Sequence, residues 1–183
     1  MKLKNVMLAS VVGASMGFVS LANAQTAPVT GQIEVKATVM EGCAISTDGG
    51  QGGGSETSWG VLDFGTLQPI WSEAVNAEVT SSVSGGAISV VCSGGVNSFT
   101  LALDGGTSGG AERQISTAGG DTLTYNIYQD DARTQAYGIN KAVTFNITNG
   151  QAVEVPLYGK LNANDTAAVA GTYTDTLTAT LQF

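Results

Sequence analysis

The sequence predicts an all-β protein, an antiparallel β-sandwich formed by a single domain. Short runs of β-branched residues alternate with glycine-rich turns, and glycine makes up 25 of the 183 residues. After the N-terminal segment, no stretch shows the 3.6-residue apolar period of an amphipathic helix. Many short strands without intervening helices are typical of β-sandwiches.

The first 24 residues are expected to be a secretory signal peptide. Lys2 and Lys4 precede an apolar stretch from Val6 to Leu21, and Ala22-Asn23-Ala24 forms a small-x-small cleavage site. Removing this segment leaves 159 residues with 5 basic and 15 acidic side chains, a formal charge of −10. This length suits one domain.

The expected strands are rich in β-branched and aromatic residues and are bounded by turn residues. They are Ile33 to Val39, Val61 to Leu67, Val75 to Val83, Ala87 to Cys92, Ser98 to Leu103, Thr122 to Gln129, Val143 to Thr148, Ala152 to Leu157 and Tyr173 to Phe183. The clearest turn signal is Asn149-Gly150, which supplies the positive φ angles of a type I′ turn. It predicts that Val143 to Ile147 and Val153 to Val155 form a β-hairpin.

The last strand alternates strictly between polar and mostly apolar residues from Thr172 onward. One face is therefore expected to pack on the core, and its residues include Leu177, Ala179, Leu181 and Phe183. Because no later segment of the sequence follows, we expect this strand to lack a neighbour on one side.

The segment from Gly31 to Val39 alternates in the same way. Its apolar face consists of Ile33, Val35, Ala37 and Val39. Two interpretations remain open from the residues alone. Either this segment is an ordinary first strand of its own domain, or it pairs with another copy of the molecule and fills a groove there.

Charge and composition exclude several functions. The sequence has no histidine, which removes the commonest general base and the imidazole metal ligand. Its acidic balance disfavours nucleic acid and anionic lipid as partners. In an exported protein, Cys43 and Cys92 are expected to form a disulfide rather than a reactive or metal-binding pair.

Two glycine-rich stretches resemble functional motifs only superficially. The segment Thr47 to Ser58 lacks the lysine and the strand-to-helix transition of a phosphate-binding loop, so we expect a mobile surface loop. The segment Gly106 to Gly110 fits the G-x-S-x-G pattern of a nucleophile elbow. That elbow needs a following helix and a histidine, and the sequence supplies neither.

Several motifs together resemble the spore coat protein U domain, and within it the major pilins of archaic chaperone-usher fimbriae. They are Gly42-Cys43-Ala44-Ile45, Leu62-Asp63-Phe64-Gly65-Thr66, Ile88-Ser89-Val90-Val91-Cys92, Leu123-Thr124-Tyr125-Asn126-Ile127-Tyr128, Tyr158-Gly159 and Gly171-Thr172-Tyr173-Thr174-Asp175-Thr176-Leu177. The resemblance covers nearly all of residues 29 to 183.

The resemblance implies an incomplete immunoglobulin-like sandwich that a donor strand from another subunit completes. Residues 25–41 would form the donor arm and residues 42–183 the pilin domain. Donor side chains would be Ile33, Val35, Ala37 and Val39, and Leu177, Ala179, Leu181 and Phe183 would flank the acceptor groove, which also faces the chaperone.

As the resemblance further implies, the function would be that of a structural fimbrial subunit supporting adhesion and biofilm formation. Its partners would be neighbouring pilin subunits, a periplasmic chaperone and an outer-membrane usher, and it would reach the surface of a Gram-negative bacterium through the periplasm. No cofactor, metal or enzymatic activity is expected.

Two other functions remain as alternatives. The first is a self-complete secreted binding module, for example for carbohydrate, whose N-terminal arm pairs within its own domain. The second is a glycosidase that uses paired carboxylates, which would have to lie about 5 to 10 Å apart in a cleft.

Overall fold

The computed structural model describes residues 28–45, 58–82, 85–108, 110–148 and 150–183. The expected signal peptide and nearly all of the glycine-rich segment 47–58 lie outside these residues. The chain divides into two compact units, Met1–Ala37 and Thr38–Phe183. In the first unit, the described residues 28–37 carry no helix or strand, and their side chains are exposed.

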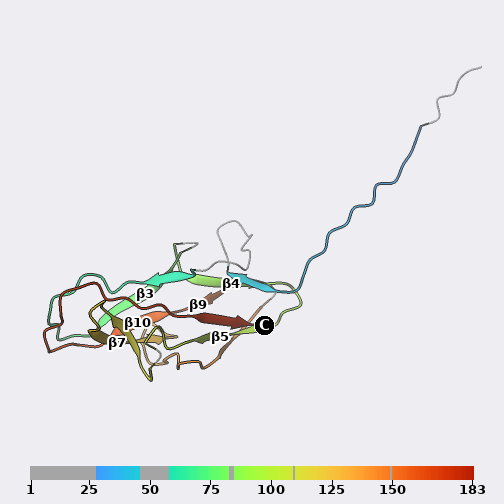
Figure 1. The fold of residues 1–183 in the computed structure, drawn as a ribbon. Helices are drawn as coiled ribbons and strands as arrows, with labels where there is room; N and C mark the ends of the chain where they lie inside the picture. Colours follow the sequence, from blue (N-terminus) through green and yellow to red (C-terminus); the bar gives the residue numbers. More distant parts are fainter. Residues whose placement is uncertain (1–27, 46–57, 83–84, 109, 149) are drawn as a thin grey trace, which may run out of the picture. The chain divides into compact units, whose positions relative to one another are not determined.

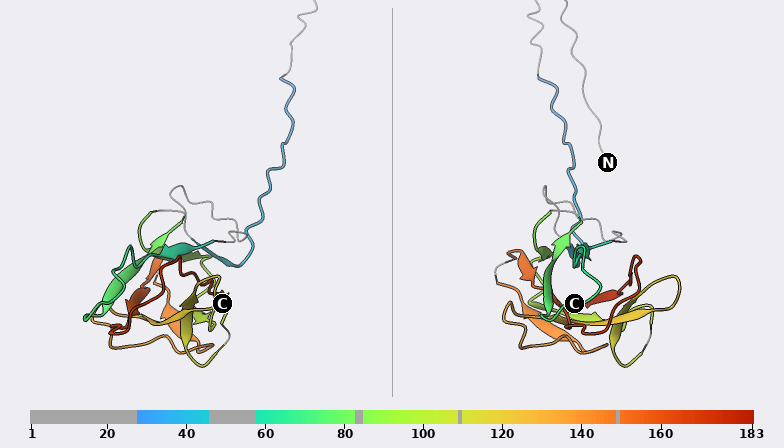
Figure 2. Two further views of the ribbon diagram at one scale, coloured as in Figure 1. Left: turned by 60° about the vertical axis from the view of Figure 1, so that its left-hand side comes forward. Right: turned by 90° about the vertical axis from the view of Figure 1, so that its left-hand side faces the viewer.

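The second unit consists of short strands in three sheets (Figure 1). The strands described are β1 (Cys43–Ile45), β2 (Gly60–Leu62), β3 (Val75–Ser81), β4 (Ile88–Cys92), β5 (Ser98–Leu103), β6 (Arg113–Ser116), β7 (Thr122–Tyr128), β8 (Val143–Asn146), β9 (Val153–Val155), β10 (Tyr158–Leu161) and β11 (Ala179–Gln182). Their orders are β1-β4-β9, β2-β3-β10-β7-β6 and β11-β5-β8. In the views of Figure 2 the strands surround a common interior.

All pairs between these strands are antiparallel, and the described residues contain no helix. The predicted all-β antiparallel fold is therefore confirmed. Consistently, no described helix is long and apolar enough to cross a membrane.

The strand predictions are correct in position for eight of the structure's elements, although several of these strands are shorter than expected. The predictions missed β1, β6 and β10, which are only three or four residues long. The predicted strand Ile33 to Val39 is wrong for the single chain, where these residues form no strand. A strand needs a hydrogen-bonding partner, which alternation alone does not supply.

The predicted hairpin between residues 143 and 155 is also wrong. β8 pairs with β5 and β9 pairs with β4, so the two strands belong to different sheets. Gly150 does adopt a positive φ of 65°, and Asn149 lies outside the described residues. The chain therefore passes from one sheet to the other between β8 and β9. The partner of β8 is β5, on which its apolar side chains pack: Phe145 stacks on Phe99 with 5.1 Å between the ring centroids.

The interior brings all three sheets together. Its core contains Ile88 and Val90 from β4, Leu101 and Leu103 from β5, Ile127 from β7, Val155 from β9 and Leu161 from β10. The expected disulfide is confirmed: Cys43 and Cys92 are bonded and are also partners in the register of β1 and β4. The bond therefore fixes the start of the folded unit to a central strand.

Candidate functional site

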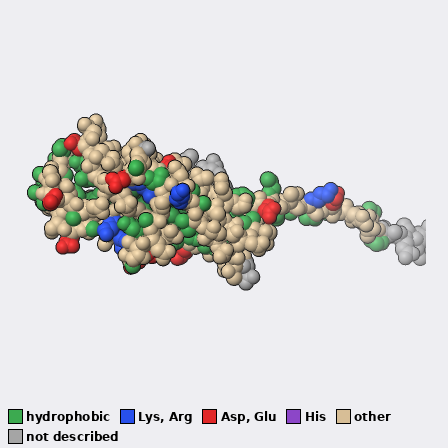
Figure 3. Space-filling view, turned by 90° about the horizontal axis from the view of Figure 1, so that it is seen from below, with side chains coloured by type: hydrophobic (Ala, Val, Ile, Leu, Met, Phe, Trp, Pro, Cys, Tyr) green, Lys and Arg blue, Asp and Glu red, His purple; other side chains and the backbone are tan. Residues whose placement is uncertain are grey.

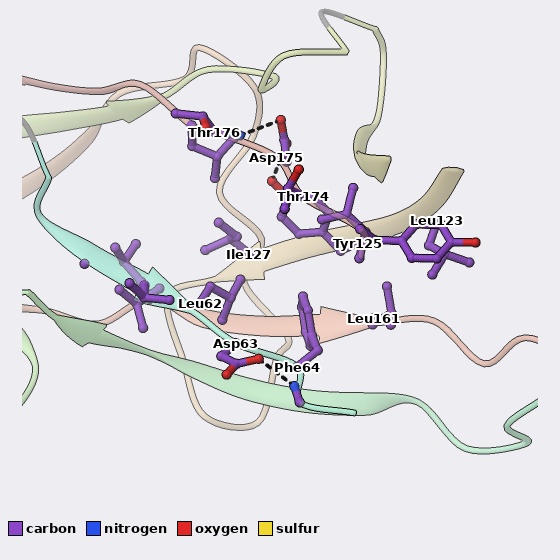
Figure 4. Close-up of a pocket in the computed structure, with 18 of the residues that line it drawn as sticks. Leu62, Asp63, Phe64, Leu123, Tyr125, Ile127, Leu161, Thr174, Asp175 and Thr176 are labelled. Atoms are coloured by element: carbon purple, nitrogen blue, oxygen red, sulfur yellow. Dashed lines mark hydrogen bonds between the residues drawn. The ribbon is translucent and has the colours of Figure 1, made fainter. Parts of the chain in front are cut away.

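An open groove of about 1180 Å³ runs through the second unit. One wall is the segment 58–69, which contains β2, and the other is the segment 168–179, which leads into β11. Figure 4 shows Leu62 and Phe64 on the first wall and Thr174, Asp175 and Thr176 on the second. The two walls are at least 99 positions apart in the sequence, so only the fold brings them together.

The floor of the groove is the hydrophobic core itself. Side chains of β7 and β10 project into this space (Figure 4). Core residues that line the groove are Ile88, Val90, Leu101, Leu103, Tyr125, Ile127, Val155, Leu157 and Leu161. These floor residues are themselves buried. The partly buried side chains of Leu62, Phe64 and Leu177 also line the groove, and an apolar occupant that covered them would remove hydrocarbon surface from water.

The C-terminal wall has one paired and one unpaired edge. Thr174 exchanges main-chain hydrogen bonds with Ser116 at 2.9 and 3.0 Å, and the carbonyl of Thr178 accepts one from the amide of Asp104 at 3.0 Å. In an extended segment, alternate residues direct their main-chain groups to opposite edges. The main-chain groups of Thr174 and Thr178 thus face β6 and β5. The main-chain groups of Tyr173, Asp175 and Leu177 face the other edge and bond to no described main-chain group.

The opposite wall repeats this arrangement. The amide of Ser82 donates to the carbonyl of Trp59 at 3.1 Å, and Val61 opposes Thr80 in the register of β2 and β3. The main-chain groups of Gly60 and Leu62 therefore point away from β3. Each wall thus presents a strand edge whose donors and acceptors have no main-chain partner in the part of the chain that the structure describes.

A glycine on the floor allows the first wall to lie close to the core. A Cβ atom added to Gly159 of β10 would lie 2.6 Å from Cδ1 of Leu62. Any larger residue would push Leu62 and its strand outward. Gly159 and Leu62 belong to two of the motifs on which the sequence resemblance rests, and this contact gives both a physical reason.

The structure places the predicted acceptor residues at different points. Leu177 and Ala179 line the groove, whereas Leu181 and Phe183 are not among its lining residues. Leu181 is half-buried against the core, and Phe183 is 63% exposed. Sequence reasoning missed the wall formed by Leu62, Phe64 and Leu67, although the alternation of Leu62-Asp63-Phe64 was a signal for it.

The predicted donor residues are strongly exposed. Ile33 is 90% exposed, and Val35 and Val39 are each 87% exposed. On the other face of the same segment, the Lys36 ammonium lies 2.7 Å from the Glu34 carboxylate. Hydrophobic side chains are visible along this segment in Figure 3. These side chains are therefore free to be buried by a partner.

A carboxylate at the rim of the groove collects several hydrogen bonds. The Tyr125 hydroxyl donates to Oδ2 of Asp175 at 2.7 Å, and the Thr107 amide donates to its Oδ1 at 2.7 Å. Burial raises the pKa of Asp175, but the hydrogen bonds from Thr107, Tyr125 and Thr176 outweigh it and hold this pKa below its usual value. Burial, and then the bond to Asp175, raise the pKa of Tyr125.

Beside this carboxylate lies a buried cation. The Arg113 guanidinium donates to the carbonyls of Asp104, Tyr137 and Leu103 at 2.9, 2.7 and 3.2 Å. Burial lowers its pKa, and the nearby Tyr125, Asp104 and Asp175 oppose that shift. Its hydrogen bonds fix the backbone at the end of β5, so we assign Arg113 a structural role.

The polar groups do not assemble into a metal centre. Among the described ranges, no group of three or more Cys, Asp or Glu side chains could hold a metal ion. What the groove offers is an apolar floor between two unpaired strand edges, an arrangement that can bind an extended peptide by strand addition.

Comparisons with known proteins identify the family and the fold of this chain. The family model of the Spore Coat Protein U domain matches residues 29–180, and no curated protein matches the chain. Among solved structures, the chain is similar to the CsuC-CsuE chaperone–tip adhesion subunit pre-assembly complex from archaic chaperone-usher Csu pili of Acinetobacter baumannii, with 19% identity and a TM-score of 0.51. A chaperone–tip adhesin complex of CFA/I fimbriae biogenesis has 10% identity and a TM-score of 0.40.

Coverage is unequal in both structural comparisons. The match to the Acinetobacter complex covers 80% of this chain and 40% of that one, and the CFA/I match covers 77% and 40%. The chain thus spans about 40% of the length of these neighbours. At 19% identity, the first similarity establishes a shared immunoglobulin-like fold.

Proposed function

The chain belongs to the Spore Coat Protein U domain family, and we propose that it is a structural subunit of a surface fimbria that polymerises by donor-strand complementation. The observation that supports this proposal is the groove, which is lined by core residues and whose two walls each have a strand edge without a main-chain partner among the described residues. Residues 25–41 would serve as the donor arm and residues 42–183 as the receiving domain.

In this mechanism, the arm of one subunit enters the groove of the next. Ile33, Val35, Ala37 and Val39 are the donor side chains, and their backbone pairs with the groove edges. Burying Ile33, Val35 and Val39 would contribute roughly 5 to 9 kcal/mol, at about 1.5 to 3 each. Each added main-chain hydrogen bond would contribute roughly 1 kcal/mol more, so the link would be stable.

On the receiving side, Leu177 and Ala179 contact the donor directly, since both line the groove. Leu181 and Phe183 continue the same face beyond it, and the 63% exposure of Phe183 leaves this side chain open to a partner. Before assembly a periplasmic chaperone covers this strand, because an open apolar edge invites aggregation.

The remaining steps follow from the same mechanism. An outer-membrane usher exchanges the chaperone for the next subunit's arm, and the fibre reaches the surface of a Gram-negative bacterium, where it supports adhesion and biofilm formation. The Acinetobacter neighbour is a chaperone–subunit complex, which supports a chaperone partner here. The subunit acts mechanically, without a cofactor and without catalysis.

Deletion of the arm tests the proposal. Surface material from cells that express the wild-type chain is run on a denaturing gel with and without boiling. Strand-exchanged subunits give a ladder of detergent-resistant multimers that collapses to one band on boiling. A chain that lacks residues 30–40 should give the single band without boiling, while Gln32→Ala, on the polar face of the arm, retains the ladder.

An intact ladder from the deletion variant would overturn the proposal. A wild-type monomer band in unboiled material would instead favour the self-complete binding module.

A further inference from the structure

The C-terminal wall of the groove changes its pairing partner halfway along. Residues 179–182 pair with β5 as β11, whereas Thr174 pairs with Ser116 of β6, which belongs to a different sheet. Between these two points, residues 175–177 make no main-chain ladder with either strand among the described residues. Side-chain carboxylates hold the wall to the body over this interval.

We propose that Asp104 and Asp175 form a reciprocal clamp that positions the C-terminal wall for strand addition. This inference rests on the proposed function and deepens it. Each carboxylate accepts a main-chain amide from the other's segment: Oδ1 of Asp104 from Thr178 at 2.9 Å, and Oδ1 of Asp175 from Thr107 at 2.7 Å. The hydroxyl of Thr107 also donates to Asp175.

A glycine makes room for this clamp. Gly106 has a φ of +76°, and a Cβ atom added there would overlap the Asp175 carboxylate. Its amide donates to Oδ1 of Asp104 at 2.9 Å, so one glycine serves both carboxylates. Gly106 and Thr107, which belong to the sequence that mimics a nucleophile elbow, thus have a role in holding the groove wall.

The clamp is anchored to the core on its inner side. Tyr125 of β7 is buried, at 3% exposure, and its hydroxyl donates to Asp175. Arg113 of β6 fixes the carbonyls of Leu103 and Asp104, from which the Asp104 carboxylate extends. The two carboxylates are therefore held from β5, β6 and β7 together.

The clamp orders the part of the wall with which an incoming strand would pair. In residues 175–177, the main-chain groups of Asp175 and Leu177 face the groove. On the opposite edge, no main-chain hydrogen bond to β5 or β6 supports this part of the wall among the described residues. A wall that is already ordered pays no further ordering cost when a strand docks, and preorganisation of this kind increases affinity. Loss of the clamp should weaken strand capture even where the sandwich stays folded.

A binding assay separates this role from simple stabilisation. The probe is a fluorescent synthetic peptide of residues 29–40, added to the full-length chain at a concentration where that chain is monomeric. We expect Asp175→Ala to dissociate the peptide at least about tenfold faster than the wild type. Asp175→Asn retains one carbonyl oxygen and should rescue most of the loss, and Asp165→Ala, which alters an exposed carboxylate, should match the wild type.

Each variant is also tested for its unfolding midpoint, and binding is measured well below that midpoint. If Asp175→Ala fails to fold, Tyr125→Phe replaces it, since this change removes one hydrogen bond and retains the ring; we expect about threefold faster dissociation. Wild-type peptide kinetics in a folded clamp variant would overturn the clamp and leave the fimbrial function standing. Failure of the wild type to bind the peptide would overturn both.

Discussion

The N-terminal arm and the C-terminal wall have the same sequence pattern and opposite structures. Both alternate apolar and polar residues, yet the arm forms no strand and exposes Ile33 and Val35 almost completely. The wall and β11, which continues it, pack Leu177 and Leu181 against the core and pair with two sheets. Alternation therefore defines a face, and a face becomes a strand only where a partner edge exists.

The arm and the groove also differ in what each lacks. The apolar side chains of the arm are exposed and pack on no described residue. The groove is lined by apolar side chains, and no described strand lies between its two walls. On the proposed function, the two deficits complement each other in successive subunits.

A charge on the apolar face of the arm should abolish assembly. In Val35→Asp, an ionised carboxylate would have to enter the apolar groove, which costs far more than the hydrophobic gain it replaces. We expect no detergent-resistant multimers on an unboiled gel, with the monomer's unfolding midpoint unchanged because Val35 is 87% exposed. Thr38→Asp, on the polar face, serves as the control, and a normal ladder from Val35→Asp would refute the donor role.

Removing the disulfide should destabilise the folded domain. The bond closes a loop between Cys43 and Cys92, which are 49 positions apart, and its loss should lower the free energy of unfolding by roughly 4 kcal/mol. Chemical denaturation of the Cys43→Ala/Cys92→Ala double variant measures this change. An unchanged unfolding curve would show that the β1–β4 ladder alone fixes the domain.

Acid should destabilise the C-terminal wall of the groove. Hydrogen bonds, outweighing burial, hold the pKa values of Asp104 and Asp175 below their usual value of 3.8. A pKa that is lower in the folded state stabilises the fold above pH 3.8, and this stabilisation is lost as pH falls through the folded-state values. The difference in unfolding midpoint between wild type and Asp175→Asn should therefore shrink toward pH 2, and a constant difference would contradict this linkage.

The smallest effect is expected from the ion pair on the arm. Lys36 and Glu34 are 2.7 Å apart, with side chains 79% and 73% exposed, and exposed pairs of this kind contribute about 0 to 1 kcal/mol. Lys36→Ala should leave both the unfolding midpoint and the multimer ladder close to wild type. A clear loss of multimers would mean that the polar face of the arm also makes specific contacts.

The sequence was sufficient to predict the long strands but not their partners. Ser98 to Leu103 was predicted at its observed bounds because its β-branched and apolar residues are delimited by turn residues. The hairpin prediction at Asn149-Gly150 failed because a turn signal is local, whereas the burial of Phe145 against Phe99 is not. The short strands β1, β6 and β10 carry too few residues for a periodic signal.

The candidate site shows the same division. The alternation predicted that Leu177 and Ala179 face the core, and the family resemblance placed them beside a groove, which both line. The alternation of Leu62-Asp63-Phe64 indicated an apolar face but not the segment that it would oppose. The contacts of Asp104 and Asp175 had no sequence signal, because they join residues distant in the chain. Local patterns carry no information about such contacts.

The sequence by itself determined the all-β class, the absence of imidazole chemistry and the two alternating ends. Each of these follows from residue type and short-range periodicity, which act within a few positions of the chain. Only the tertiary structure decided that the C-terminal segment spans two sheets and that an open groove lies between it and β2. The physical reason is that hydrogen bonds and burial are satisfied between segments, and a choice of partner exists only once the chain has folded.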